Sequence, residues 1–521
     1  MQVYATFWAL LPPIIAIVLA LITKEVYSSL FIGIVVGALF YSGFSFEGTL
    51  NHIFFDQVDD ASYGMISVLS DSSNVGILIF LVILGTLVAL MNNAGGSAAF
   101  GRWATTHIKT RVGAQLATIA LGVLIFVDDY FNCLTVGSVM RPVTDTHNIS
   151  RAKLAYLIDA TAAPVCIIAP ISSWAAAVAG FASESDANGI ALFISAIPYN
   201  FYALLTILMM ITLSVTKTDF GPMAIHERNA LKGDLFTTEN RPYADADAHE
   251  DTSKGKVIDL VLPVVVLVVA CVIGLIYTGG FFSGESFVSA FANCSASMGL
   301  VLGSSVALVF AIIFFIIRRV LSFKDCMACI PEGFKAMVPA ILILTFAWTL
   351  KSMTDSLGAA EFVAGVVKAS AGSFMNFLPA VIFLIACLLS FATGTSWGTF
   401  GILIPIVLAV FGTDSGALST ISMSACMAGA VCGDHCSPIS DTTIMSSAGA
   451  QCDHVNHVST QLPYAISVAG ISFITYLICG VLITVGMANP VWVALPLGIV
   501  LTIVYIMLMK RATSKKYASQ A

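Results

Sequence analysis

The sequence predicts an all-α polytopic membrane protein, and three observations support that fold class. The chain has 521 residues, of which 58% are hydrophobic and only 10% are charged, and its mean hydropathy is +0.94. A soluble domain is usually about a quarter charged and under half apolar. Apolar runs long enough to cross a bilayer, about 17 residues or more, recur along the chain. This composition argues against a soluble enzyme, a nucleic-acid-binding protein and a disordered scaffold.

Uninterrupted apolar segments are expected to form full spans at residues 7–23, 26–42, 75–92, 188–213, 257–278, 299–317, 336–350, 460–486 and 490–509. Two interrupted segments, 152–182 and 419–451, are long enough to cross with an unwound middle, which gives about 11 full spans. No basic n-region precedes the first span, so we do not expect a cleaved signal peptide. The 12 cysteines lie mostly in apolar runs and suggest no disulfide framework.

Two other apolar segments, 112–142 and 374–412, are interrupted by small or polar residues near their middle. Each arm of 112–142 has about 15 residues and rises about 23 Å, which is shorter than the hydrocarbon core of about 30 Å. We therefore expect a re-entrant hairpin there. The arms of 374–412 are longer, and although a hairpin is favoured, charge bias does not distinguish it from two full spans.

The basic residues orient the chain, because short cytoplasmic loops retain Lys and Arg. With the N-terminus outside and the two hairpins returning to their side of origin, 21 of the 23 basic residues fall inside. Only Lys351 and Lys368 remain outside, together with acids such as Asp56 and Glu184. The predicted topology therefore has the N-terminus outside and the C-terminus inside.

The same topology divides the chain into two halves. Residues 1–216 form the first repeat, 217–256 a cytoplasmic polar linker, 257–486 the second repeat, and 487–521 an extra span with a basic cytoplasmic tail. Phe126–Asn132 corresponds to Phe391–Trp397, and Pro170–Ser173 corresponds to Pro438–Asp441. Because one half starts outside and the other inside, the repeats are predicted to be inverted. Inverted repeats with broken helices are typical of secondary transporters, whose sites form where the breaks meet.

Polar residues at the predicted breaks are the candidate binding site. The carboxylates at lipid depth are Asp128, Asp129, Asp159, Asp434 and Asp441. Each costs about 2.5–3.5 kcal/mol at the membrane centre, so a function is expected. The other oxygen donors are Asn132, Ser172, Ser173, Thr393, Thr395, Ser396, Ser437, Ser440 and Thr442. No Lys or Arg falls in the breaks, and hard oxygen ligands suit a small cation, so we expect Asp129, Asp434 and Asp441 to bind Na⁺ rather than a transition metal.

Adjacent Asp128 and Asp129 can be neutralised by protons or by Na⁺, because burial and a like charge both favour the neutral acid. Neighbours on a helix point about 100° apart, so one of the two, Asp129, is favoured as the cavity residue. Structural alternatives remain open. Either acid can cap a broken helix, and Ser440 or Thr442 can bond back to its own helix.

Two other site types receive less support. Cys432, His435, Cys436, Cys452, His454 and His457 are close in sequence, as in a zinc site. However, the first three lie at a break, whereas the last three are expected near the inner surface, solvated or paired with a carboxylate. An intramembrane aspartyl protease would need two Asp on one water, but the Gly-x-Gly-Asp signature is missing before Asp434. We therefore expect no enzymatic activity.

The runs Gly433–Ser447, Ser390–Thr399 and Thr460–Tyr464 resemble the NhaC-type sodium/proton antiporter family of the ion-transporter superfamily, and the likeness extends across nearly the whole chain. The resemblance implies a multi-pass protein of the bacterial inner membrane, commonly a homodimer. It also implies that a transport domain built from the hairpins and broken helices moves like an elevator against a scaffold.

The resulting functional prediction is exchange of Na⁺ for H⁺ through carboxylates at the membrane midplane. Na⁺ and H⁺ are the transported or coupling ions, no cofactor is expected, and the partners are lipid and ions rather than nucleic acid. The alternative is a Na⁺- or H⁺-coupled transporter of a small amino acid or organic acid.

Overall fold

The computed structural model describes residues 3–23, 25–58, 61–126, 129–169, 174, 178, 189–243, 255–359, 361–362, 365–366, 375–411 and 417–518. The first half contains η1 (Phe7–Leu10), α1 (Leu11–Thr23), α2 (Val26–Ser42), α3 (Phe46–Phe54), β1 (Asp56–Val58), β2 (Ala61–Tyr63), α4 (Met65–Ser70), α5 (Ser72–Asn93), α6 (Gly96–His107), α7 (Arg111–Leu124), α8 (Asp129–Thr146), α9 (Arg151–Asp159), α10 (Ala163–Cys166), α12 (Gly189–Ala196), η2 (Ile197–Tyr199), α13 (Phe201–Thr216) and α14 (Gly221–Ala230). The second half contains α16 (Ile258–Thr278), η3 (Phe281–Ser283), α17 (Phe287–Ala292), α18 (Ala296–Ile317), α19 (Phe323–Ser356), η4 (Met375–Phe377), α21 (Leu378–Thr393), α22 (Ser396–Phe411), α23 (Ala417–Cys436), α24 (Asp441–Gly449), α25 (His454–Thr484) and α26 (Val491–Ala518).

The described chain is helical apart from connections and one short antiparallel hairpin of β1 and β2, in which Asp56 pairs with Tyr63. Six of its helices are long and apolar enough to cross a membrane, or eight if two bent pairs each count as one span. The predicted all-α membrane fold is therefore confirmed. The predicted number of about 11 spans stays a prediction. Part of the difference lies in α1 and α2, which are apolar but have only 13 and 17 residues.

Two predicted spans differ in shape from the expected straight helix. The span at 188–213 is bent by 48° between Tyr199 and Phe201. Pro198 lacks a backbone N–H there, and Asn200 caps α13 by accepting a hydrogen bond from the Ala203 N–H at 3.2 Å. The span at 336–350 is the second part of α19, which has 34 residues and continues to Ser356.

Helix breaks occur where small and polar residues predicted them. Gly394 ends α21 with a left-handed φ of +65°, which glycine adopts without steric cost. Pro438 follows the end of α23, and Ser440 then caps α24. In the first half, α7 ends at Leu124 and α8 begins at Asp129, and α9 and α10 are separated at residues 160–162. Whether the two halves are inverted in the membrane stays a prediction, as do the domain boundaries.

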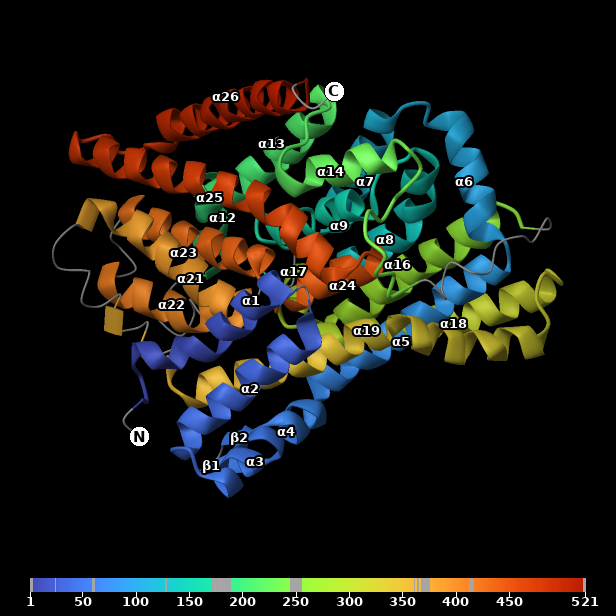
Figure 1. Ribbon diagram of the computed structural model, residues 1–521, viewed down its shortest axis with the longest axis horizontal. Helices are drawn as coiled ribbons and strands as arrows, with labels where there is room; N and C mark the ends of the chain where they lie inside the picture. The colour runs from blue at the N-terminus through green and yellow to red at the C-terminus, as the bar shows by residue number, and fades with distance from the viewer. Residues whose placement is uncertain are drawn as a thin grey trace.

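The helices form two groups that meet at the breaks (Figure 1). In the lower part of the view, α2, α5, α18 and α19 pack on one another, and α16 packs on α18. In the upper part, α25 packs on α26 and α13, and α21 packs on α23. Near the centre α8 crosses α24 closely, since a Cβ on Gly137 would stand 2.4 Å from the Gly449 carbonyl carbon. This crossing brings the breaks of the two halves together.

The first part of the expected polar linker is folded against the helices. Its helix α14 packs on α9 and α25. Glu227 is 4% exposed, accepts a hydrogen bond from the Ser150 N–H at 2.9 Å and pairs with Arg111. Burial raises the pKa of Glu227, Asp219 raises it further, and Arg111 and Lys153 lower it. The rest of the linker, residues 244–254, lies outside the described residues.

Candidate functional site

In the first half, one amide side chain joins two helix breaks. Asn132, buried in the first turn of α8, has its Nδ2 within 2.7 Å of the Gly122 carbonyl, 2.9 Å of Ile125 and 3.2 Å of Thr161. Carbonyls at the end of a helix have no partner within the helix. Asn132 therefore stabilises the end of α7 and the end of α9 at the same time.

In the second half, a carboxylate and two hydroxyls join the corresponding breaks. Asp434, 2% exposed near the end of α23, accepts hydrogen bonds from the Ser396 hydroxyl at 2.6 Å and from the Ser396 N–H at 3.2 Å. The Ser437 hydroxyl donates to the Phe391 carbonyl at 2.8 Å. Because Ser396 begins α22, the Asp434 carboxylate lies at the positive end of that helix.

Contacts between the halves then bring the two pairs of breaks together. The Tyr130 hydroxyl, beside Asp129 at the start of α8, donates to Asp441 Oδ2 at 2.6 Å. Asp441 is the first residue of α24. Asp434, near the end of α23, and Asp441, at the start of α24, flank the same break. Asp159 and Asp434, both buried, and Asp441, which is half-buried, form an acidic cluster beside the breaks, and their joint binding of an ion stays a prediction.

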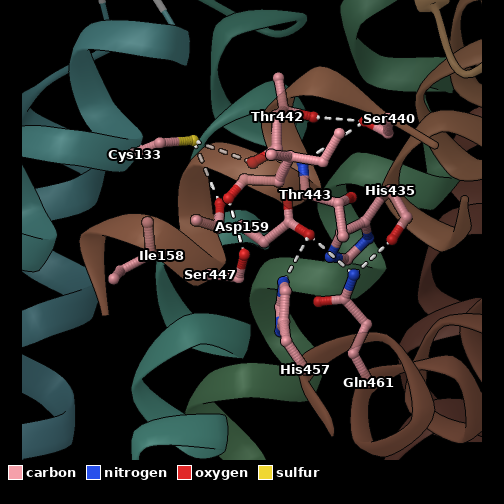
Figure 2. A network of polar contacts seen from close by, with 12 residues as sticks. Cys133, Ile158, Asp159, His435, Ser440, Thr442, Thr443, Ser447, His457 and Gln461 are labelled. Atoms are coloured by element: carbon pink, nitrogen blue, oxygen red, sulfur yellow. Dashed lines mark hydrogen bonds and ion pairs between the residues drawn. The ribbon is translucent and has the colours of Figure 1, made fainter. Parts of the chain in front are cut away.

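Asp159 is the centre of a second polar network, which Figure 2 shows. Its Oδ2 accepts a hydrogen bond from Gln461 Nε2 at 2.7 Å and lies 3.1 Å from His457 Nε2. The Gln461 amide also donates to the His435 carbonyl, and Tyr202 bonds His435 Nδ1 at 2.8 Å. This network connects the end of α9 to α25.

Neither His454 nor His457 is solvated, since their side chains are 5% and 0% exposed. His457 instead pairs with the Asp159 carboxylate, the other expected environment. His454 bonds the Pro438 carbonyl at 2.7 Å and Ser447 at 3.2 Å, so it supports the break before α24. The sequence missed the role of His457, because its partner Asp159 is 298 residues away in the chain. A possible signal was the polar Gln461 within an apolar span.

A cavity of about 680 Å³ lies beside the breaks. Tyr130, Asp441, Thr393 and Thr395 contribute to one wall. Trp348, Lys351 and Asp355 of α19 contribute to the opposite wall. The cavity therefore lies between the broken helices and the group of α5, α18 and α19, and Asp441 connects it to the buried carboxylates.

The cavity contains a basic residue that the sequence placed in an outer loop. Lys351 pairs with Asp355 at 2.6 Å, and its Cε is 3.7 Å from where a Cβ on Gly398 would stand. It lies there because α19 continues as a helix to Ser356, beyond the predicted span end at residue 350. No Lys or Arg falls within the breaks themselves, but Lys351 of α19 lies beside one of them.

The other predicted site residues fall into three sets. Those that line the cavity are Asp441, Thr393 and Thr395. Those that are buried beside it or deeper are Asp129, Asn132, Asp159, Ser396, Asp434, Ser437, Ser440 and Thr442. Asp128, Ser172 and Ser173 lie outside the described residues. Two hydroxyls also have structural partners, since Thr393 donates to the Leu389 carbonyl at 2.9 Å and Ser440 caps α24.

In and around the acidic cluster, several buried oxygen atoms receive no hydrogen bond from the part of the chain that the structure describes. They are Asp434 Oδ1, Asp159 Oδ1, Asn132 Oδ1, Gln461 Oε1 and Thr443 Oγ1. Among the described residues, no three His, Cys, Asp or Glu side chains converge as metal ligands, so the zinc alternative gains no support. Carboxylate, amide and hydroxyl oxygens together can instead bind a proton or a hard monovalent cation.

The apolar helices, the meeting breaks and the charged cavity define a multi-pass membrane transporter. The profile of the Na⁺/H⁺ antiporter family matches residues 165–481, more than half of the chain. The chain belongs to this family, which confirms the NhaC-type resemblance of its motifs.

Curated relatives agree with this assignment. An uncharacterized protein of Haemophilus influenzae is 38% identical over 491 residues, which cover 91% of each chain. The malate-2H⁺/Na⁺-lactate antiporter of Bacillus subtilis is 31% identical over 32% of this chain and 34% of its own length. The arginine/ornithine antiporter of Halobacterium salinarum is 37% identical over 21% of this chain and 23% of its own length. The two relatives with named activities are transporters rather than enzymes.

Proposed function

We propose that this chain is a secondary antiporter of the bacterial inner membrane that exchanges Na⁺ for H⁺ at Asp434 and Asp441. The observation that carries the proposal is the environment of Asp434. One of its oxygens is held by Ser396 at a helix break, and the other is buried near Ser440 and accepts no hydrogen bond of normal length from the residues that the structure describes. Such a carboxylate requires a positive partner at lipid depth.

The exchange needs no covalent step. Burial and the nearby carboxylates favour an arrangement in which a proton or a Na⁺ neutralises the cluster. Because one set of oxygens serves both ions, binding of one releases the other. Asp441 lies at the cavity and passes ions to Asp434, and Asp129, the third predicted Na⁺ ligand, is buried next to Tyr130.

Alternating access is proposed to follow an elevator mechanism in which the hairpins and broken helices move against α5, α18 and α19. The cavity at this boundary supports it. A short thiol cross-linker between Lys351→Cys on α19 and Gly398→Cys on α22 should stop transport reversibly, whereas each single variant with the same reagent should keep its own activity. Undiminished transport in the cross-linked protein would contradict relative movement.

The family resemblance also supports a homodimer.

The test of ion exchange is Na⁺-dependent proton flux in proteoliposomes. Adding Na⁺ should dissipate an imposed pH gradient, and K⁺ should not. Asp434→Asn and Asp441→Asn should each lose at least about 100-fold in rate, while Glu47→Gln, which changes an exposed acid on α3, should retain the wild-type rate. Full Na⁺-driven flux in the Asp434→Asn, Asp441→Asn double variant would refute the proposed site.

A second candidate is cation-coupled transport of a small amino acid or organic acid. The cavity favours it, because about 680 Å³ is far more than an ion needs. The names of the malate/lactate and arginine/ornithine relatives support it as well. This candidate predicts little proton flux with Na⁺ alone and accumulation of a radiolabelled solute.

A further inference from the structure

The cavity contains an ion pair that cation exchange does not explain. Lys351 and Asp355 lie four residues apart on α19, and their side chains are 35% and 42% exposed. On a water-facing helix such a pair is an ordinary weak contact. Here both side chains line the cavity with Asp441, in a chain with few charges.

The size and lining of the cavity indicate an organic ligand. Its volume of about 680 Å³ falls within the range of about 300–1,000 Å³ for small-molecule sites, whereas one water occupies about 30 Å³. Among the described residues that line it, four are aromatic, namely Tyr63, Tyr130, Trp348 and Trp397. These rings suit an apolar side chain.

The charges indicate which polar groups that ligand carries. Among the described lining residues, the acids Asp71, Asp355 and Asp441 outnumber the single cation Lys351. A dianion would meet this excess of negative charge and is disfavoured. A zwitterion presents one charge of each sign, and the Lys351–Asp355 pair offers one partner for each.

We propose that the cavity binds a small zwitterion with an apolar side chain, that is, an apolar α-amino acid. Its carboxylate binds Lys351 and its ammonium group binds Asp355, so the ligand separates the ion pair and replaces it with two new contacts. Lys351 lies over the first turn of the 16-residue helix α22, whose N-terminus adds a favourable field for the carboxylate. The inference rests on the proposed transport function, but it uses residues other than Asp434 and Asp441.

The first test uses the purified wild-type protein and three matched probes in calorimetric titrations. L-phenylalanine carries both charges, phenethylamine lacks the carboxylate, and 3-phenylpropionate lacks the ammonium group. L-phenylalanine should bind about 10- to 100-fold more tightly than either analogue, because each analogue leaves one charged partner unsatisfied.

The second test reverses the preference with single substitutions. Lys351→Met should bind L-phenylalanine at least tenfold more weakly and should bind phenethylamine at least as well as L-phenylalanine. Asp355→Asn should instead prefer 3-phenylpropionate. Lys335→Met, which changes an exposed lysine on the same helix, should keep the wild-type order.

Equal binding of the three probes, no binding of L-phenylalanine, or an unchanged order in both variants would overturn the inference. The comparison of the three probes on the wild-type protein tests the inference even if a variant fails to fold. Na⁺-driven proton flux without amino acid separates the two proposals. Normal flux with no L-phenylalanine binding overturns only the zwitterion site, whereas selective L-phenylalanine binding without flux overturns only the exchange of Na⁺ for H⁺.

Discussion

Asn132 illustrates how one buried residue can serve structure and binding together. Its amide nitrogen shares two hydrogens among three backbone carbonyls at two helix breaks, while its Oδ1 receives no hydrogen bond from the residues that the structure describes. The sequence predicted it as a cation ligand. Its contacts show instead that its Nδ2 group stabilises the backbone at the helix breaks.

The substitution Asn132→Asp separates these roles. Aspartate is a stronger cation ligand of the same shape, but its ionised carboxylate cannot donate to the carbonyls of Gly122, Ile125 and Thr161. The Gly122 carbonyl still accepts from the Ile125 N–H, but those of Ile125 and Thr161 lose this donor. We expect a loss of at least about 2 kcal/mol in unfolding free energy, since each unsatisfied carbonyl costs about 1–3 kcal/mol. Chemical denaturation in detergent measures the change. A variant as stable as wild type with tighter Na⁺ binding would show that the donor side is unimportant.

At the scale of single residues, the sequence predicts which acidic residues belong to the candidate site better than it predicts their partners. Asp434, Asp441 and Ser396 stand out because polar residues at lipid depth are rare. Lys351, His457 and Gln461 could not be placed from the sequence, because their roles depend on contacts with residues far away in the chain or on the length of α19. Local patterns carry no such information.

Among the elements, the helix break between α21 and α22 depends most directly on one residue. Gly394 has a φ of +65°, and a Cβ there would stand 2.6 Å from the Ile439 carbonyl oxygen. This contact is also where the break of one helix pair touches the break of the other.

Gly394→Ala should therefore lower the melting temperature and abolish Na⁺-driven flux, since the left-handed backbone costs about 1–2 kcal/mol and the clash adds to it. Gly470→Ala is the matched control in α25, where a Cβ meets nothing within 4 Å. It should be neutral or stabilising by up to about 1 kcal/mol. Equal effects of the two variants in thermal-shift and flux measurements would contradict this account of the break.

The folded part of the linker gives a pH-dependent prediction. Burial raises the pKa of Glu227 above its ordinary value. Its contribution to stability is thus fully present below the pKa of the unfolded chain and is lost as pH rises through the folded pKa. As the pH increases from about 4.5 to 8, the melting temperature of Glu227→Gln minus that of the wild type should therefore increase. The exposed Glu239→Gln should show no such trend, and a falling difference for Glu227→Gln would contradict the sign.

Element positions were largely predictable, because apolar length and interruptions by Gly, Pro and Ser determine where helices begin and end. The predicted span 26–42 coincides with α2, and all four breaks lie within the predicted interrupted segments. The bend at Tyr199 and the folded helix α14 were missed. Both depend on contacts with other elements, and a polar segment such as 217–243 does not reveal these contacts.

For the whole molecule, the arrangement of charges predicts the topology. Alkaline phosphatase fused after Gly284 should be active, because this loop is expected outside. The same enzyme fused after Ser514 should be inactive, and a green fluorescent protein there should fluoresce. The opposite result at either position would reject the assigned orientation.

The central claim concerns the whole transporter: Na⁺ and H⁺ compete for one buried set of carboxylate oxygens. The most direct test is the equilibrium dissociation constant of Na⁺, measured by calorimetry on the purified protein across a pH series. Competition predicts that this constant rises by about tenfold for each unit of acidification in the range where the cluster takes up a proton. Asp434→Asn should abolish this dependence, and Glu47→Gln should preserve it. A dissociation constant independent of pH in the wild-type protein would contradict the claim.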